Sequence, residues 1–305
     1  MLAEALGLTD FDQTIATITG TTPQAVPFGR SSRSAEPDRN VGVDGLRRRP
    51  IPAQLPHGSQ HFTAREREME RMDSWLDEAE NRPLGAPVLI LTGAAGVGKS
   101  ACAVQWGHRT AGRFPGGQLY VDLANDRSPS PEPGDAMRGL LDALGVPPAE
   151  IPTDAAVQAA LFRSMVSGQR MLILIDNAAR IEQVRPLLPG SASCAVVVTS
   201  REPLTELIAD DGAHLQEILP FGEEDARRFL LSRLDPRRLP RDIWAVTEII
   251  RRCAGSPRLL SMLCARAAVQ PTVDPTRIVE EMNLFETRAA FGESAPTAPL
   301  RQSVN

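Results

Sequence analysis

The sequence contains almost no lysine. Lysine and arginine together total 33 residues, and Lys99 is the single lysine among them. An exposed surface position accepts either cation, whereas a site built for a compact ammonium on a thin stem does not accept the planar guanidinium of arginine. One lysine kept among so many arginines therefore indicates a site that needs its shape.

Cysteine is also scarce. The chain has four cysteines in 305 residues and no Cys-x-x-Cys pair, which excludes the disulfide framework of a small secreted domain. We therefore expect reduced, mostly buried thiols. His57 and His61 are four residues apart but flank Gly58 and Ser59 in linker-like sequence, so we predict no zinc or redox site.

Long hydrophobic runs are missing as well. No apolar run approaches the roughly 18 to 20 residues that a membrane-spanning helix needs. The N-terminus carries acids and threonines where a secretory signal would have a basic start followed by an apolar stretch. With 42% hydrophobic residues and a net charge of −5, the sequence predicts a soluble, cytoplasmic protein with no membrane partner.

The chain divides into four predicted segments. Residues 1–56 are rich in proline and show no sustained helical or strand periodicity, so we expect an irregular tail and linker. A short helix within residues 2–18 is an alternative that the sequence leaves undecided. Residues 57–220 alternate strand-like and helical patterns, which is typical of an α/β domain with a mainly parallel sheet. Residues 221–285 carry only helical patterns and predict a small all-helical domain, and residues 286–305 are expected to fray.

About five strands are expected in the α/β part. The strand-like runs are Val88–Leu91, Gln118–Leu123, Met171–Ile175, Ala195–Thr199 and, less regularly, His214–Ile218. A first helix, capped by Thr63, precedes them and ends before Pro83. The other helical patterns are Ser100–Thr110, Ala136–Leu144, Ala155–Val166, Ile181–Leu188, Pro203–Ile208, Glu223–Leu234, Arg241–Cys253, Pro257–Val269 and Pro275–Leu284.

The turn after the first strand explains Lys99. Residues 93–100 match G-x-x-x-x-G-K-[ST] between an apolar strand and a helix. In this P-loop the glycines let backbone amides point at phosphate oxygens, the lysine reaches the β- and γ-phosphates, and the hydroxyl of Ser100 binds magnesium. The sequence thus predicts a P-loop NTPase that binds ATP or ADP with Mg²⁺. The expected nucleotide contacts are Gly93, Ala94, Ala95, Gly96, Val97, Gly98, Lys99, Ser100 and Ala101.

A P-loop needs an acidic partner for its magnesium. The third strand ends in Asp176, at the carboxyl edge where open α/β sheets bind ligands, so Asp176 is predicted to be the Walker B residue and a magnesium ligand. The next residue, Asn177, can orient water but cannot accept its proton, which predicts slow hydrolysis. Arg201 follows the fourth strand. Its position in the sequence is compatible with a γ-phosphate sensor and equally with an ordinary surface arginine.

Several segments in order carry a family resemblance over roughly residues 52–285. They are Phe62-Thr63-Ala64-Arg65-Glu66, the P-loop, Phe114-Pro115-Gly116-Gly117-Gln118-Leu119-Tyr120-Val121-Asp122-Leu123, Leu174-Ile175-Asp176-Asn177, Val198-Thr199-Ser200-Arg201 and Cys253-Ala254-Gly255-Ser256-Pro257. Together they resemble the NB-ARC module of the STAND ATPases, in the version found in antibiotic regulatory proteins and related transcriptional regulators of actinobacteria.

The resemblance implies roles for three residues. It implies that Arg65 lies near the nucleotide, that Arg201 is the sensor arginine, which would act with Lys99 and Asp176, and that Pro257 packs against the adenine side. Two positions depart from the family pattern. Ala64 stands where the family usually has glycine, and Ser256-Pro257-Arg258 replaces Leu-Pro-Leu. The family's winged-helix subdomain would follow residue 285, so the chain is expected to be a stand-alone or truncated switch core.

The leading hypothesis is an ATP/ADP-binding signalling switch that hydrolyses slowly and regulates transcription through an unknown protein partner. A nucleotide-dependent oligomer is compatible with it. Direct specific DNA binding is not expected, because the net charge is negative and the one basic cluster, Arg47–Arg49, lies in the linker. The alternatives are an active P-loop ATPase or phosphotransferase of a biosynthetic pathway, and a degenerate interaction module with structural ADP. Asn177 and the helical domain favour the switch.

Overall fold

The computed structural model describes residues 51–81, 85–124, 133–234, 243–270 and 272–281. The predictions for the helix within residues 2–18, for the arginine run and for the C-terminal tail lie outside the described residues.

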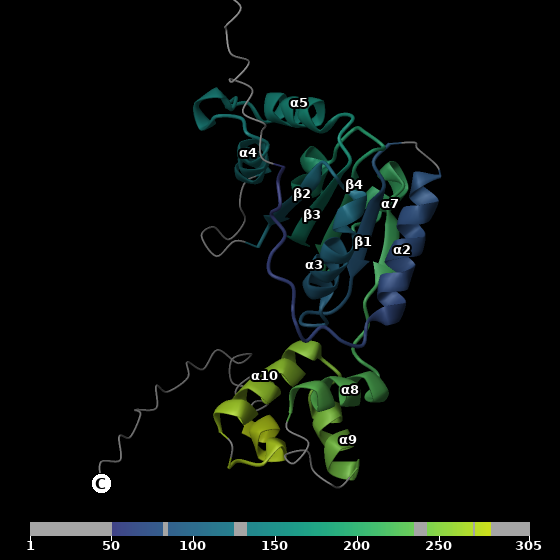
Figure 1. The fold of residues 1–305 in the computed structure, drawn as a ribbon, viewed down its shortest axis with the longest axis vertical. Coiled ribbons are helices and arrows are strands. Elements are labelled where there is room, and N and C mark those ends of the chain that lie inside the picture. Colours follow the sequence, from purple (N-terminus) through teal and green to yellow (C-terminus); the bar gives the residue numbers. More distant parts are fainter. Residues whose placement is uncertain (1–50, 82–84, 125–132, 235–242, 271, 282–305) are drawn as a thin grey trace, which may run out of the picture. The chain divides into compact units, whose positions relative to one another are not determined.

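Five parallel strands form one sheet in the order β2-β3-β4-β1-β5 (Figure 1). They are β1 (Val88–Thr92), β2 (Gly117–Asp122), β3 (Met171–Ala178), β4 (Ala195–Ser200) and β5 (His214–Glu217). The predicted strands are confirmed, and so is the α/β fold class with a parallel sheet.

Helices follow most strands, as expected for parallel crossovers. The helices between strands are α3 (Lys99–Thr110), α4 (Pro133–Ala143), α5 (Ala155–Val166), α6 (Ile181–Val184) and α7 (Thr205–Asp211), and α2 (Glu66–Glu80) precedes β1. Helices α8 (Glu223–Arg233), α9 (Ile243–Arg252) and α10 (Pro257–Val269) come after the sheet, and residues 275–281 are also helical. Among the described residues, no helix has the length and apolarity to cross a bilayer.

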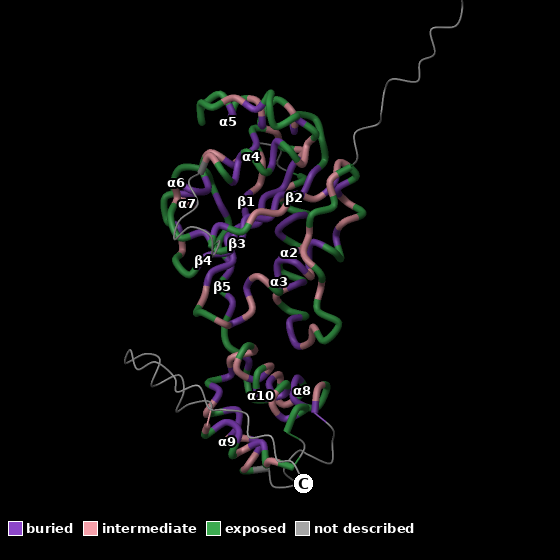
Figure 2. Tube along the Cα trace, turned by 90° about the vertical axis from the view of Figure 1, so that its left-hand side faces the viewer, coloured by how far each residue is buried: buried purple, intermediate pink, exposed green. Residues whose placement is uncertain are grey.

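The inner strands are apolar over most of their length because both sheet faces are covered, and polar residues stand at their C-terminal ends. In β1, Leu89 and Leu91 belong to the core shared with α2 and α3, whereas Ile90 belongs to the core on the opposite face, which includes residues of α4 and α5. All five residues of β1 are buried, as are all six of β4 (Figure 2). Burial on two faces explains why these strands read as continuous apolar runs rather than alternating ones.

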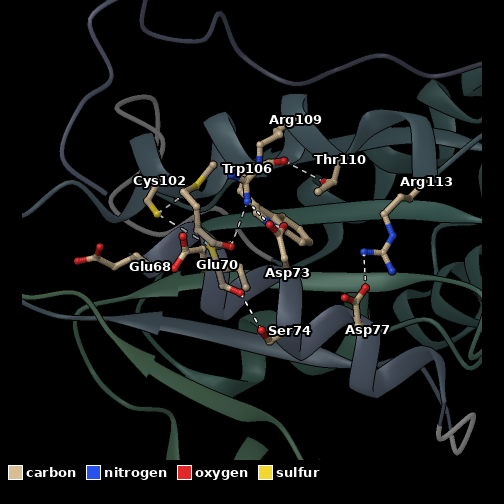
Figure 3. A network of polar contacts seen from close by, with 12 residues as sticks. Glu68, Glu70, Asp73, Ser74, Asp77, Cys102, Trp106, Arg109, Thr110 and Arg113 are labelled. Carbon is tan, nitrogen blue, oxygen red and sulfur yellow. Dashed lines mark hydrogen bonds and ion pairs between the residues drawn. The ribbon is translucent and has the colours of Figure 1, made fainter. Parts of the chain in front are cut away.

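A network of polar contacts ties α2 to α3, the helix that carries the P-loop lysine (Figure 3). The indole N–H of Trp106 donates to Asp73 Oδ1 at 2.9 Å, and Arg109 pairs with the other oxygen of the same carboxylate. The rings of Trp75 and Trp106 lie 6.1 Å apart in a tilted arrangement. These contacts hold the C-terminal half of α3, the helix that begins at the P-loop lysine, against a second helix.

The first helix begins later than predicted. Thr63 was expected to cap it, but α2 starts at Glu66 with Arg65 at the N-cap and with no side-chain cap bond. The physical reason is Ala64, whose φ of 62° turns the chain and separates Thr63 from the helix. Glycine adopts this conformation without strain, and glycine is what the resembling family usually has there.

The residues just before the predicted domain start also attach to the sheet. The backbone N–H of Gln118 in β2 donates to the Pro52 carbonyl at 2.7 Å, and the N–H of Gln54 donates to the Gln118 carbonyl at 3.0 Å. At Gly117 a Cβ would lie 2.3 Å from the Pro52 oxygen, so the close approach requires glycine. Residues 52–54 thus cover the outer edge of β2.

The helices after the sheet have a core of their own. Its members include Phe229 and Leu230 of α8, Ile249 of α9, and Leu260 of α10, all buried. The predicted run of helices at the C-terminal end is therefore confirmed. All four cysteines are buried, as predicted, and burial raises the pKa of the Cys102 thiol to about 12.

Candidate functional site

A cavity of about 700 Å³ opens beside the P-loop. This volume lies within the range of small-molecule sites in proteins. Its wall combines P-loop residues 95–101 with residues from three other parts of the chain. The others are Ser59, His61, Phe62, Thr63 and Arg65 before α2; Ala124, Asn177, Ala178, Ala179, Ser200, Arg201 and Glu202 at the strand ends; and Phe221, Phe229, Arg233, Pro257, Arg258 and Ser261 from the C-terminal helices.

The P-loop backbone has the conformation that its glycines predict. Gly98 precedes α3 with a φ of 97°, and Gly93 has a φ of 143°, where side chains are rarely tolerated. A Cβ on Gly93 would lie 2.3 Å from the carbonyl oxygen of Ile218, which follows β5. Neither position can carry a side chain without moving the loop.

Lys99 is buried inside this loop. Its Nζ donates to the carbonyl oxygens of Gly93 at 2.7 Å and Ala94 at 3.0 Å. Burial, and then the nearby positive charge of Arg201, lower the pKa of Lys99, while the carboxylate of Asp176 acts in the opposite direction. Two cations so close together favour an anion between them, and a phosphate group fits that need.

Asp176 lies behind the P-loop serine rather than in the cavity wall. The hydroxyl of Ser100 donates to Asp176 Oδ1 at 2.7 Å, and Asp176 is 3% exposed. A hydroxyl oxygen and a carboxylate oxygen are hard ligands of the type that Mg²⁺ prefers. The donor set therefore fits the predicted magnesium, although no cluster of three His, Cys, Asp or Glu side chains among the described residues could hold a metal alone.

Asn177 lies in the wall with a left-handed backbone, at a φ of 57°. Its N–H donates to Thr199 Oγ1 at 3.0 Å, and its Nδ2 donates to Asp122 Oδ1 at 2.8 Å. The β3–β4 register shifts between Ile175 and Ala178 at this place. Strained backbone held by side chains is frequent at functional sites.

Arg65 lines the cavity, but both of its terminal guanidinium nitrogens form hydrogen bonds with other residues of the chain. Its Nη2 donates to the carbonyls of Val97 and Leu219, each at 2.8 Å, and its Nη1 pairs with Glu68 at 2.6 Å. The guanidinium carbon lies 4.6 Å from the centre of the Phe221 ring. Arg65 therefore links the P-loop to an aromatic part of the wall.

The C-terminal helices touch the P-loop at Gly96. The carbonyl of Gly96 accepts the Ser256 hydroxyl at 3.3 Å and the Arg258 N–H at 3.2 Å. Pro257, between them, lines the cavity close to Gly98. Thr63 Oγ1, also a wall residue, is buried and has no hydrogen-bond partner, so it is a polar atom that a ligand could satisfy.

The structure thus gathers most of the predicted site residues around one cavity. Arg65, residues 95–101, Arg201 and Pro257 are in its wall, whereas Gly93, Ala94 and Asp176 are not. Sequence reasoning did not assign three side chains that contact Asp176 or Asn177, namely Tyr120, Asp122 and Thr199. The available signal was their position near the ends of two strands, but only the strand order makes those strands neighbours of β3.

Comparison with known proteins agrees with this geometry. A family model described as an AAA domain matches residues 82–230. The chain is 34% identical over 224 residues to the regulatory protein AfsR of Streptomyces coelicolor and 35% identical over 221 residues to that of Streptomyces griseus. Each alignment covers 72% of this chain and 22% of the relative, so the chain spans about a fifth of these proteins.

A solved structure shows the same fold. The Walker-type ATPase of Pyrococcus abyssi matches with a TM-score of 0.51 at 12% identity, over 80% of this chain and 77% of that one. At this identity the match supports the fold alone. The P-loop ATPase fold implies a nucleotide ligand.

Proposed function

Because the chain carries an AAA-type P-loop domain and is homologous to a region of the AfsR regulatory proteins, we propose that it is an ATP- and ADP-dependent signalling switch with slow ATPase activity. The observation that carries the proposal is the combination of a complete phosphate cradle with an amide at position 177. Lys99, Ser100 and Asp176 support phosphate and magnesium binding, whereas Asn177 provides no proton acceptor.

In such a switch, the predicted site residues have distinct roles. The P-loop amides and Lys99 hold the phosphates, and Ser100 and Asp176 hold Mg²⁺, which when bound screens phosphate charge. Arg201 senses the γ-phosphate, and Arg65 and Pro257 border the rest of the nucleotide. The repulsion between the charges of Lys99 and Arg201 supports phosphate binding by Lys99 and γ-phosphate sensing by Arg201, because a polyphosphate between the two cations would relieve it.

Slow hydrolysis follows from what surrounds the reacting phosphate. A water molecule must lose a proton as it attacks, and an amide at position 177 can orient that water without taking the proton. The neighbouring carboxylate of Asp122 is not in the cavity wall, and its Oδ1 already accepts from Asn177 and from the Ala124 N–H. We therefore propose that binding, rather than turnover, carries the function.

We expect the purified chain to contain ADP and to turn over far more slowly than the roughly 1 to 100 per second of kinases. Release of the nucleotide would require Pro257 and its helix to move away from the P-loop, and such a step can be slower than chemistry. The measurement is chromatography of nucleotide released by denaturation, followed by steady-state phosphate release. The control is the eluate of a mock purification without the protein, which is taken through the same denaturation step.

Each outcome selects a function. Empty protein with turnover of several per second would remove the switch and support an active ATPase or phosphotransferase. Substoichiometric ADP with no response to added ATP would support an interaction module that keeps nucleotide as a structural cofactor.

We further propose that the chain acts in the cytoplasm on transcription through a protein partner, with an oligomeric state that depends on nucleotide. The support is the name of its relatives, which are regulatory proteins, together with a net charge of −5. Mass spectrometry of proteins that co-purify with the native chain would identify the partner. Light scattering with ADP and with ATP would report the oligomer.

We expect no specific DNA binding by this chain alone. A DNA-binding surface needs clustered cations to replace counterions at the phosphates, and the chain is acidic overall. The check is a mobility shift at physiological salt with unlabelled competitor DNA. A shifted band that survives the competitor would contradict the prediction.

A further inference from the structure

The carboxylate of Asp176 is held by three hydroxyl groups from three different elements. Ser100 of α3 and Thr199 of β4 both donate to Oδ1. The third, Tyr120 on β2, donates its hydroxyl proton to Oδ2 over 3.0 Å. The chain has a single tyrosine, and it makes this contact.

We propose that Tyr120 is a positioning residue that sets the magnesium affinity of the nucleotide site by fixing the orientation of Asp176. The inference rests on the proposed function, since it concerns the metal that the nucleotide would bring. Tyr120 would not touch the metal or the nucleotide, because it does not line the cavity and it contacts Oδ2, whereas Ser100 contacts Oδ1.

The two oxygens of the Asp176 carboxylate have different partners. Oδ1 faces the Ser100 hydroxyl, so it is the oxygen available to a cation bound by that serine. Oδ2 is taken by Tyr120 on the other side. Removing the Tyr120 hydroxyl leaves Oδ2 without this donor, so that the two hydroxyls on Oδ1 alone orient the carboxylate and hold it less firmly.

The local backbone does not hold the carboxylate by itself. The terminal torsion of aspartate is broad, so hydrogen bonds decide where its oxygens point. On the β4 side the backbone ladder is interrupted at the same place, since the β3–β4 register shifts between Ile175 and Ala178 and Asn177 has a φ of 57°. Side chains from the two flanking strands therefore determine the orientation of Asp176.

The test is Tyr120→Phe, which deletes one oxygen and keeps the ring. After removal of co-purified nucleotide, calorimetry measures the binding of a non-hydrolysable ATP analogue across a Mg²⁺ titration. We expect the Mg²⁺ concentration for half-maximal binding to rise about tenfold, as is usual when the support of a metal ligand is lost. Affinity for the analogue without Mg²⁺ should not change.

Thr110→Val is the matched control. It removes another buried hydroxyl, which donates to the Trp106 carbonyl at 2.8 Å, at the opposite end of α3 from the P-loop. This variant should keep the wild-type Mg²⁺ dependence. An unchanged Mg²⁺ requirement in Tyr120→Phe, or an equal loss of affinity with and without Mg²⁺, would overturn the proposal.

A second measurement needs no substitution. Because Tyr120 is the single tyrosine, growth on 3-fluorotyrosine places one fluorine label at this position, and ¹⁹F NMR of the full chain reports on it alone. We expect the resonance to shift when Mg²⁺ is added to the analogue-bound protein. No shift would overturn the positioning role, whereas wild-type protein that fails to bind the analogue at all would instead refute the proposed function.

Discussion

Lys99→Ala is expected to abolish measurable ATP binding. The ammonium is buried in the P-loop, where Gly93 and Ala94 carbonyls hold it. A single charge pair at about 4 Å and an effective dielectric constant near 20 is worth roughly 4 kcal/mol before desolvation is counted, and this energy corresponds to about a thousandfold in affinity. Calorimetry with ATP and Mg²⁺ measures the loss.

Two further variants separate charge from shape. Lys99→Arg keeps the charge, but the planar guanidinium is too wide for a loop in which Gly93 already approaches the backbone of Ile218, so binding should also be severely weakened. Arg71→Ala removes an exposed cation of α2 and should bind like the wild type. Wild-type affinity in both Lys99 variants would show that this loop is not the phosphate site.

Trp106→Ala is expected to lower the free energy of unfolding by about 3–5 kcal/mol. The side chain is completely buried between α2 and the sheet, where it packs against Trp75. The substitution leaves a large cavity and removes the donor to Asp73, whose carboxylate would keep only Arg109. Guanidinium unfolding followed by circular dichroism measures the change.

Trp244→Ala is the control of the same residue type. This tryptophan lies on α9 and is 77% exposed, so its removal should change the free energy of unfolding by no more than about 0.5 kcal/mol. Equal losses in the two variants would mean that the α2–α3 interface does not support the P-loop helix as described.

Local patterns in the chain were sufficient to predict the sheet and the phosphate cradle. The inner strands of a doubly covered sheet carry near-continuous apolar runs, so runs such as Val88–Leu91 mark them directly. The P-loop is one continuous segment of eight residues, 93–100. Because its glycines and Lys99 are adjacent in the chain, the sequence of this segment is enough to identify the loop. Helix α5, Ala155–Val166, has the predicted bounds because it begins at a capping aspartate, Asp154, and ends before Ser167.

The start of α2 could not be predicted in the same way. Thr63 is a good capping residue, but a positive φ at Ala64 moved the helix start to Glu66. An alanine in that conformation carries a strain that nearby contacts must offset, and Ala64 is buried among residues of the C-terminal helices. Contacts with distant parts of the chain therefore decided this boundary.

The surroundings of Asp176 also needed the tertiary structure. The sequence alone marked this aspartate as the end of an apolar strand and paired it with Ser100, because both belong to recognisable motifs. It did not reveal that Tyr120 and Thr199 would bind the same carboxylate. Parallel strands are joined by long crossovers, so the neighbours of β3 in the sheet are distant in the chain, and the order β2-β3-β4 arises only when the strands pack together.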